Sequence, residues 1–155
     1  MRLADYVIDT RGFDWPRLLR NWAWQVSGRW TVWFMNRFGD LFLHQEGPVY
    51  RLSLDDGSFT ILADSREDFA HKLDLDDNAA DWLLTPLVDR LAAAGQQPGP
   101  GECYGFVRLP VLGGDYTVEN ITIRSITFQY DALGPIFEKL KDIPDGTTVC
   151  FQSAE

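Results

Sequence analysis

Acidic side chains form the densest cluster of reactive groups in this sequence, and they lie between residues 64 and 81. This segment holds seven acidic residues against two basic ones, Arg66 and Lys72, so it carries −5 of the chain's net charge of −9. The acidic residues are Asp64, Glu67, Asp68, Asp74, Asp76, Asp77 and Asp81. Because carboxylates on a surface attract a cationic partner, we predict a partner-binding surface here. The alternative is a solvated face that only keeps the protein soluble.

A second pair of carboxylates follows two glycines in the stretch VLGGDYTVEN, residues 111–120. Asp115 comes directly after Gly113 and Gly114, and Glu119 comes four residues later. A glycine pair before a carboxylate suits a ligand loop, so Asp115 and Glu119 are candidates for a small-molecule pocket. The pair also suits a connection in which at least one glycine takes a positive φ. The stretch leads to a predicted strand, not to a helix N-terminus, so it does not match a phosphate-binding loop.

The spacing of residues does not match the common metal or nucleotide motifs. Residues 74–78 place oxygens at the first three positions of a calcium loop, but Ala79 and Thr85 stand where glycine and a bidentate glutamate are needed. The stretch GPGECYG, residues 99–105, has one residue too many for a dinucleotide fingerprint and precedes a strand. We therefore predict no metal and no cofactor.

The groups that could act as nucleophile or base are two cysteines, Cys103 and Cys150, and two histidines, His44 and His71. The cysteines form no C-x-x-C pair, and no serine lies in a G-x-S-x-G motif. We expect both thiols to be reduced and mostly buried. A pairing of Cys103 with His44 stays open, because catalytic residues assemble in space. The sequence favours a protein without catalysis, and a hydrolase is the weaker alternative.

Charge and hydropathy limit the kinds of partner. Residues 1–77 carry a charge of −4 and residues 78–155 carry −5, so neither half offers the basic face that nucleic acids need. No apolar run approaches the roughly 20 residues that span a membrane. The start MRLADYVIDTRG lacks the apolar core of a signal peptide. We expect a cytoplasmic protein that binds neither nucleic acid nor membrane.

The elements that position these groups are predicted from periodicity and turn residues. Helices are expected at 14–26, over a short stretch from 65, at 79–94 and at 130–143. Pro86 is expected to start or kink the helix at 79–94. Strands are expected at 30–35, 41–44, 49–54, 59–62, 103–109, 121–128 and 147–151. Helices and strands are segregated, which favours an α+β fold. We expect one domain over residues 1–155, with an antiparallel sheet and helices packed mainly on one side. The loop at 95–101 is the place for a sub-boundary.

Five stretches resemble, in this order, a bacterial family long labelled a domain of unknown function. They are WTVWFMNRFGDLFL (30–43), LADSREDF (62–69), DWLLTPLVDRL (81–91), GECYGFVRLPVLGGDYTVEN (101–120) and KDIPDGTTV (141–149). The similarity extends from about residue 15 to residue 149, and LGGDYTVEN is its most specific part. One branch of this family is the C-terminal domain of a type VI secretion immunity protein, which protects its producer from a DNase effector. It often stands beside a GAD-like region, and the SUKH immunity superfamily is similar in style.

The resemblance implies a SUKH-like fold and a small non-enzymatic protein that binds and blocks a cognate toxin. A type VI secretion nuclease effector is the implied class of toxin. The acidic composition is compatible with this, since nucleases carry basic clefts, so we expect a basic partner. A small-molecule-binding or regulatory module with an unknown ligand is the alternative.

Overall fold

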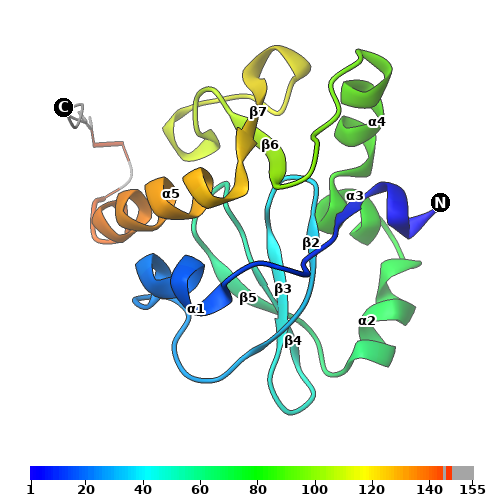
Figure 1. Ribbon diagram of the computed structural model, residues 1–155, viewed down its shortest axis with the longest axis vertical. Helices are drawn as coiled ribbons and strands as arrows, with labels where there is room; N and C mark the ends of the chain where they lie inside the picture. The colour runs from blue at the N-terminus through cyan, green and yellow to red at the C-terminus, as the bar shows by residue number, and fades with distance from the viewer. Residues whose placement is uncertain (145, 148–155) are drawn as a thin grey trace.

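A central antiparallel sheet of five strands organises the protein, in a computed structural model that describes residues 1–144 and 146–147 (Figure 1). The strand order is β1-β2-β3-β4-β5, and a separate two-stranded sheet pairs β6 with β7. The strands are β1 (Val7–Ile8), β2 (Thr31–Asn36), β3 (Leu41–His44), β4 (Val49–Leu52), β5 (Phe59–Ala63), β6 (Glu102–Phe106) and β7 (Ile121–Ser125). The helices are α1 (Trp15–Leu18), α2 (Arg66–Leu73), α3 (Asn78–Leu83), α4 (Thr85–Ala93) and α5 (Ile126–Leu140), with 3-10 turns η1 (Leu3–Asp5), η2 (Leu19–Trp22), η3 (Pro110–Leu112) and η4 (Val118–Asn120). The α+β class and the antiparallel meander are therefore confirmed.

Side-chain caps begin the first two helices where the sequence predicts them. The Asp14 carboxylate accepts the Arg17 backbone N–H at 3.2 Å, and Pro16 occupies the first turn of α1. Ser65 Oγ accepts the Asp68 backbone N–H at 3.0 Å at the start of α2. These caps satisfy amide groups that would otherwise lack partners at the helix ends.

Both faces of the central sheet are covered. Leu41 and Leu43 of β3 face a cluster with α1, η2 and α5, whereas Phe42 faces a cluster with Phe69 of α2 and Trp82 of α3. In Figure 1, α1 and α5 lie to the left of the sheet and α2 and α3 to its right. The expectation of helices mainly on one side is thereby corrected. The physical reason is the apolar run in β3, since successive strand residues point to opposite faces and each face needs a cover.

A third apolar cluster joins α4 to the small sheet. Leu87 and Leu91 of α4 pack with Tyr104 of β6, Ile121 of β7 and Phe38 of the β2–β3 turn. A backbone hydrogen bond of 2.8 Å from Tyr104 N–H to Arg37 O also ties β6 to that turn. The small sheet therefore stands at one end of the central sheet, above the β2–β3 turn (Figure 1).

Two element boundaries lie where a backbone or capping signal interrupts the pattern. The predicted strand 121–128 ends at Ser125, whose Oγ accepts the Phe128 N–H at 3.2 Å and caps α5. The predicted helix 79–94 is divided by Leu84, which takes a left-handed φ of 53°, so that Pro86 lies in the first turn of α4. Of the two expectations for Pro86, the start of a helix is therefore confirmed, and the residues before Leu84 form the separate helix α3.

The predicted final strand, 147–151, lies outside the described residues except for Thr147, which belongs to no helix or strand. The sub-boundary at 95–101 stays a prediction. No helix in the described part of the chain is long and apolar enough to cross a membrane.

Candidate partner-binding surface

The acidic segment, residues 64–81, runs along α2, the turn that follows it and α3, at the right of Figure 1. Six of its seven carboxylate side chains belong to exposed residues, and Asp68 is half-buried. Exposure is what a protein-binding surface requires, because a partner must reach the charges. The contacts of each carboxylate show whether it stabilises the fold or remains free to bind a partner.

Asp68 stabilises the start of α2. Its Oδ2 accepts the Asp64 backbone N–H at 2.9 Å and lies 3.1 Å from Lys72 Nζ. The hydrogen bond from Asp64 and the one from Lys72 hold the pKa of Asp68 below its usual value. Because its charge is already compensated within the chain, Asp68 offers less to a partner than its neighbours do.

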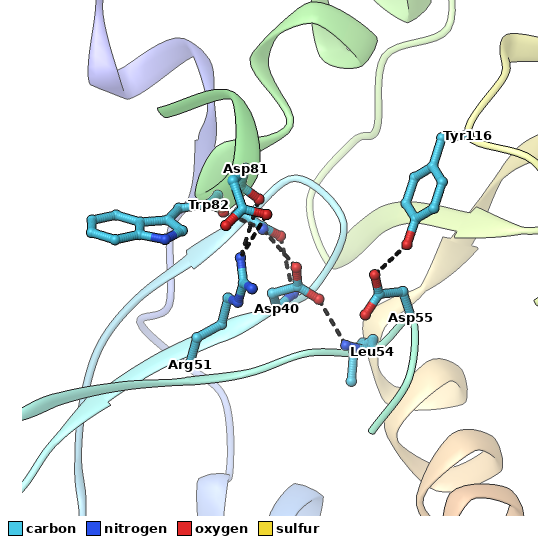
Figure 2. A network of polar contacts seen from close by, with 8 residues as sticks. Asp40, Arg51, Leu54, Asp55, Asp81, Trp82 and Tyr116 are labelled. Carbon is cyan, nitrogen blue, oxygen red and sulfur yellow. Dashed lines mark hydrogen bonds and ion pairs between the residues drawn. The ribbon is translucent and has the colours of Figure 1, made fainter. Parts of the chain in front are cut away.

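Asp81 connects α3 to the central sheet. Its backbone carbonyl accepts a hydrogen bond from Arg51 Nη1 at 3.1 Å, and its Oδ1 lies 4.0 Å from the same nitrogen (Figure 2). The Asp81 side chain is 67% exposed and the Arg51 side chain 17%. The Nε of Arg51 is buried and has no hydrogen-bond partner among the described residues. Asp81 therefore anchors Arg51 while its carboxylate still faces solvent.

The turn between α2 and α3 presents the sequence Asp74-Leu75-Asp76-Asp77, which we call the acidic turn. All four residues are exposed, and Asp76 takes a left-handed φ of 49°. Within residues 1–144 and 146–147, the three aspartates of the acidic turn form no ion pair. Their charge is therefore the part of the acidic segment most available to a cation from outside.

A polar network lies beside the acidic segment, centred on the buried Asp40 (Figure 2). Asp40 is 5% exposed; its Oδ1 accepts the Leu54 N–H at 2.8 Å and its Oδ2 accepts from Asn36 Nδ2 at 2.9 Å. The same Asn36 nitrogen donates to Trp82 O at 3.0 Å. Burial raises the pKa of Asp40, and these hydrogen bonds and the charge of Arg51 oppose that rise. The network fastens two turns of the sheet to α3.

Asp55 extends this network toward the glycine-pair loop. It accepts a hydrogen bond from the Tyr116 hydroxyl (Figure 2). The centroid of the Tyr116 ring lies 5.1 Å from that of Phe106. Burial, and then the neighbouring charge of Asp40, raise the pKa of Asp55 to about 6. The contact joins the β4–β5 turn of the central sheet to the loop between β6 and β7.

These groups border a cavity of about 130 Å³, lined by Asp40, Arg51, Ser53, Asp55, Ala80, Asp81, Leu84 and Tyr116. Its lining carries three carboxylates against one guanidinium, so its potential suits a cationic group better than an anion. Sequence reasoning missed Asp40, Arg51, Asp55 and Tyr116. A signal existed, since alternate turns of a meander lie at the same end of the sheet, and Asp40 and Asp55 belong to two such turns.

Gly113 and Gly114 are required by the backbone conformation of their loop. Gly113 takes a left-handed φ of 92°, and a Cβ on Gly114 would lie 1.8 Å from Arg108 O. The Asn120 side chain braces the same loop, since its Oδ1 accepts the Arg108 N–H at 2.9 Å and its Nδ2 donates to Arg108 O at 2.9 Å and to Asp115 O at 2.8 Å. The pair therefore allows the chain to fold back on Arg108.

Asp115 and Glu119 are both exposed. A hollow of about 270 Å³ lies near the glycine pair, where Val111 and Leu112 border it together with Trp24 and Phe137. Asp115 and Glu119 do not line this hollow. Their role as pocket residues stays a prediction.

Comparison with known families assigns the chain to a family, which its geometry alone does not do. Residues 63–145, more than half of the chain, match the model of a family described as T6SS immunity protein Tdi1, C-terminal. The chain belongs to this Tdi1 C-terminal family. A comparison with curated proteins gave no match.

The match to the Tdi1 C-terminal family begins at the last residue of β5 and includes the acidic segment, the small sheet and α5. It also includes the glycine-pair loop with Tyr116. Asp40 and Asp55, which lie in turns, and Arg51 of β4 precede the matched region. The polar network therefore joins residues inside the family match to residues before it.

In this member of the Tdi1 C-terminal family, Cys103 is a candidate nucleophile. It is free and fully buried, and burial raises the pKa of its thiol to about 12. At neutral pH the group is a thiol and not the nucleophilic thiolate. The prediction of a reduced, buried thiol is confirmed for Cys103, and Cys150 lies outside the described residues. Among the described residues, no three His, Cys, Asp or Glu side chains gather into a metal site.

Proposed function

We propose that this protein is a non-enzymatic immunity protein that binds a cognate toxin and neutralises it. Membership of a type VI secretion immunity family is the observation that carries the proposal. A secreted nuclease effector is the class of toxin that we infer. The protonated, buried state of Cys103 agrees with a role that needs no nucleophile.

The acidic segment is the surface that we assign to toxin binding. Nucleases bind phosphate through basic side chains, so a nuclease presents the charge that complements this segment. Asp64, Glu67 and the acidic turn have no ion pair within the described part of the chain. Binding there would cover the basic cleft of the toxin and exclude its substrate.

A toxicity-rescue test with matched variants examines this proposal. A candidate toxin gene is first sought next to the gene of this protein and is then expressed together with wild-type protein or with a triple variant of the acidic turn, Asp74→Asn, Asp76→Asn and Asp77→Asn. The wild type is expected to restore growth, and the triple variant to bind at least about tenfold more weakly, because three uncompensated charges are lost. Binding is measured by biolayer interferometry.

The control variant removes the same number of charges elsewhere, through Asp115→Asn, Glu119→Gln and Glu138→Gln, all at exposed positions. It is expected to bind like the wild type. Failure of the wild type to restore growth would contradict the immunity function. Equal binding by both triple variants would contradict the acidic-turn surface only.

A small-molecule-binding or regulatory role is the second candidate, and the 270 Å³ hollow beside Val111 and Leu112 favours it. A ligand in this hollow would raise the melting temperature by mass action. Screening small metabolites by thermal shift tests this role, with Leu112→Trp as the variant expected to fill the hollow and cancel any shift. A ligand that stabilises both proteins equally would bind elsewhere.

A further inference from the structure

Strand β5 forms an open edge of the central sheet. It is last in the strand order, and among the described residues it pairs only with β4. Within the described residues, the backbone groups of residues 59–63 make no hydrogen bond outside this pairing. None of the five residues, FTILA, is charged. An uncharged edge strand is a template on which another extended chain can pair.

The register shows which residues point to this open edge. Ser53 N–H donates to Ser58 O at 2.9 Å, so residues 53 and 58 form a hydrogen-bonded pair of the antiparallel hairpin. Such pairs alternate along a ladder, so Thr60, opposite Arg51, is the next β5 residue that bonds to β4. The N–H and C=O groups of Phe59 and Ile61 therefore point outward.

Apolar side chains accompany these outward backbone groups. Ile61 is 53% exposed. Beside it, the rings of Tyr50 and Phe59 stack and both meet Trp30 edge to face, with centroids 5.0 to 5.2 Å apart. All three aromatic residues are half-buried, so part of each ring system remains accessible. Aromatic side chains of this kind contribute strongly to protein interfaces.

Charge decides between the two occupants that an open edge invites. A second copy of this chain would bring another net charge of −9 to the edge, and the two copies would repel. A basic partner would instead be attracted, because β5 leads directly into Asp64 and the acidic segment. An apolar centre next to a charged rim is also the usual anatomy of a protein interface.

We propose that an extended segment of the basic toxin pairs with the edge of β5 and adds a strand to the central sheet. The segment would place apolar side chains against Ile61 and Phe59 and a lysine or arginine beside Asp64. This inference rests on the proposed function, and it names the contact through which the toxin is held. Main-chain pairing supplies affinity in this binding mode, and the side chains supply specificity.

Amide hydrogen exchange, followed by NMR, tests the strand pairing directly. The probe is the toxin domain that the rescue test identifies, inactivated at its catalytic residue. In the free protein, the Phe59 and Ile61 amides are expected to exchange quickly and the Thr60 amide slowly. In the complex, the Phe59 and Ile61 amides are expected to slow by at least about a hundredfold.

Matched substitutions provide an independent measurement. Ile61→Asp is expected to weaken toxin binding at least about tenfold, because it places a charge at the apolar centre of the contact. Val107→Asp is the control, since Val107 is 63% exposed but lies beyond β6, away from this edge. It is expected to bind like the wild type. Thermal melts of both variants show whether the fold is intact.

The outcomes separate the two proposals. A complex in which the Phe59 and Ile61 amides stay fast, or in which both variants bind like the wild type, overturns the strand pairing and leaves the immunity function standing. Slow exchange of these two amides in the free protein also overturns it, because the edge is then already occupied. Absence of any binding by the wild type overturns the immunity function and this inference with it.

Discussion

Asp55 lies where the fold opposes its ionisation. It is half-buried beside Asp40, and its pKa rises from 3.8 to about 6. Between about pH 4 and pH 6 the folded state therefore binds more protons at this group than the unfolded state does. Stability falls as the pH rises through this window, and above it the cost of the charged form is fully present.

We predict that Asp55→Asn increases the free energy of unfolding at pH 7.5 by about 1–2 kcal/mol, because it removes a partly buried charge and keeps an acceptor for Tyr116. At pH 4 the difference should vanish, since Asp55 is then protonated in the folded state. Urea denaturation between pH 4 and pH 8 measures both values. Asp142→Asn is the control, because Asp142 is exposed and lies outside this turn. Equal stability of Asp55→Asn and wild type at pH 7.5 would contradict the prediction.

The glycine pair gives a second prediction at this scale. Gly114→Ala should cost about 3 kcal/mol of stability, because its Cβ would overlap Arg108 O. Gly113→Ala meets nothing closer than 3.4 Å and should cost only roughly 1 kcal/mol, for its left-handed φ. Thermal or urea unfolding measures the stability of the two variants and shows which of them is less stable. The reverse order would show that the loop moves aside.

At the scale of elements, α5 packs against η2 through a glycine. A Cβ on Gly134 would lie 2.4 Å from Asn21 O, and the Gly134 carbonyl accepts a hydrogen bond from Trp24 Nε1 at 3.2 Å. Trp22, at 0% exposure, donates to Tyr130 O at 3.1 Å on the same helix. The backbones of η2 and α5 are therefore in direct contact.

We predict that Gly134→Ala destabilises the protein by about 2 kcal/mol, although the same change in a free helix gains about 1 kcal/mol. The overlap with Asn21 forces η2 and α5 apart. Ala132→Gly is the control and should cost about 1 kcal/mol through helix propensity alone. Calorimetry compares the two, and a more stable Gly134→Ala would refute the close packing.

At the scale of the whole molecule, the net charge of −9 governs how a basic partner approaches. Long-range attraction raises the association rate, and salt screens it over about 8 Å at physiological ionic strength. We predict that the association rate with the toxin falls about tenfold between 50 and 500 mM NaCl, with little change in the dissociation rate. Stopped-flow fluorescence measures it, and a rate indifferent to salt would argue against electrostatic steering.

The triple variant of the acidic turn serves as the internal reference for this salt dependence. With three charges fewer, its association rate should depend less steeply on salt than that of the wild type. If the salt dependence of the association rate is equally steep for both proteins, the attraction arises elsewhere on the surface and the acidic turn does not contribute to it.

Local signals determined most of the elements. Asp14 and Ser65 predicted helix starts, and glycine and aspartate turns predicted the meander, because capping and turn chemistry depend on near neighbours. The boundary at Ser125 was predicted wrongly, since the alternation before it continues for a few residues into the helix. The two-residue strand β1 was not foreseen, because so short a run carries no period.

The sequence by itself determined the α+β class, the acidic segment and the family resemblance, all of which follow from composition, local pattern and residue order. Only the tertiary structure decided that both sheet faces are covered, that Asp40 and Asp55 line one cavity, and that no described residue pairs with the outer edge of β5. These features depend on residues distant in the chain, and no local rule brings Tyr116 to Asp55 or Arg51 to Asp81. The burial that raises the pKa of Asp55 likewise exists only once the two turns and the glycine-pair loop have packed together.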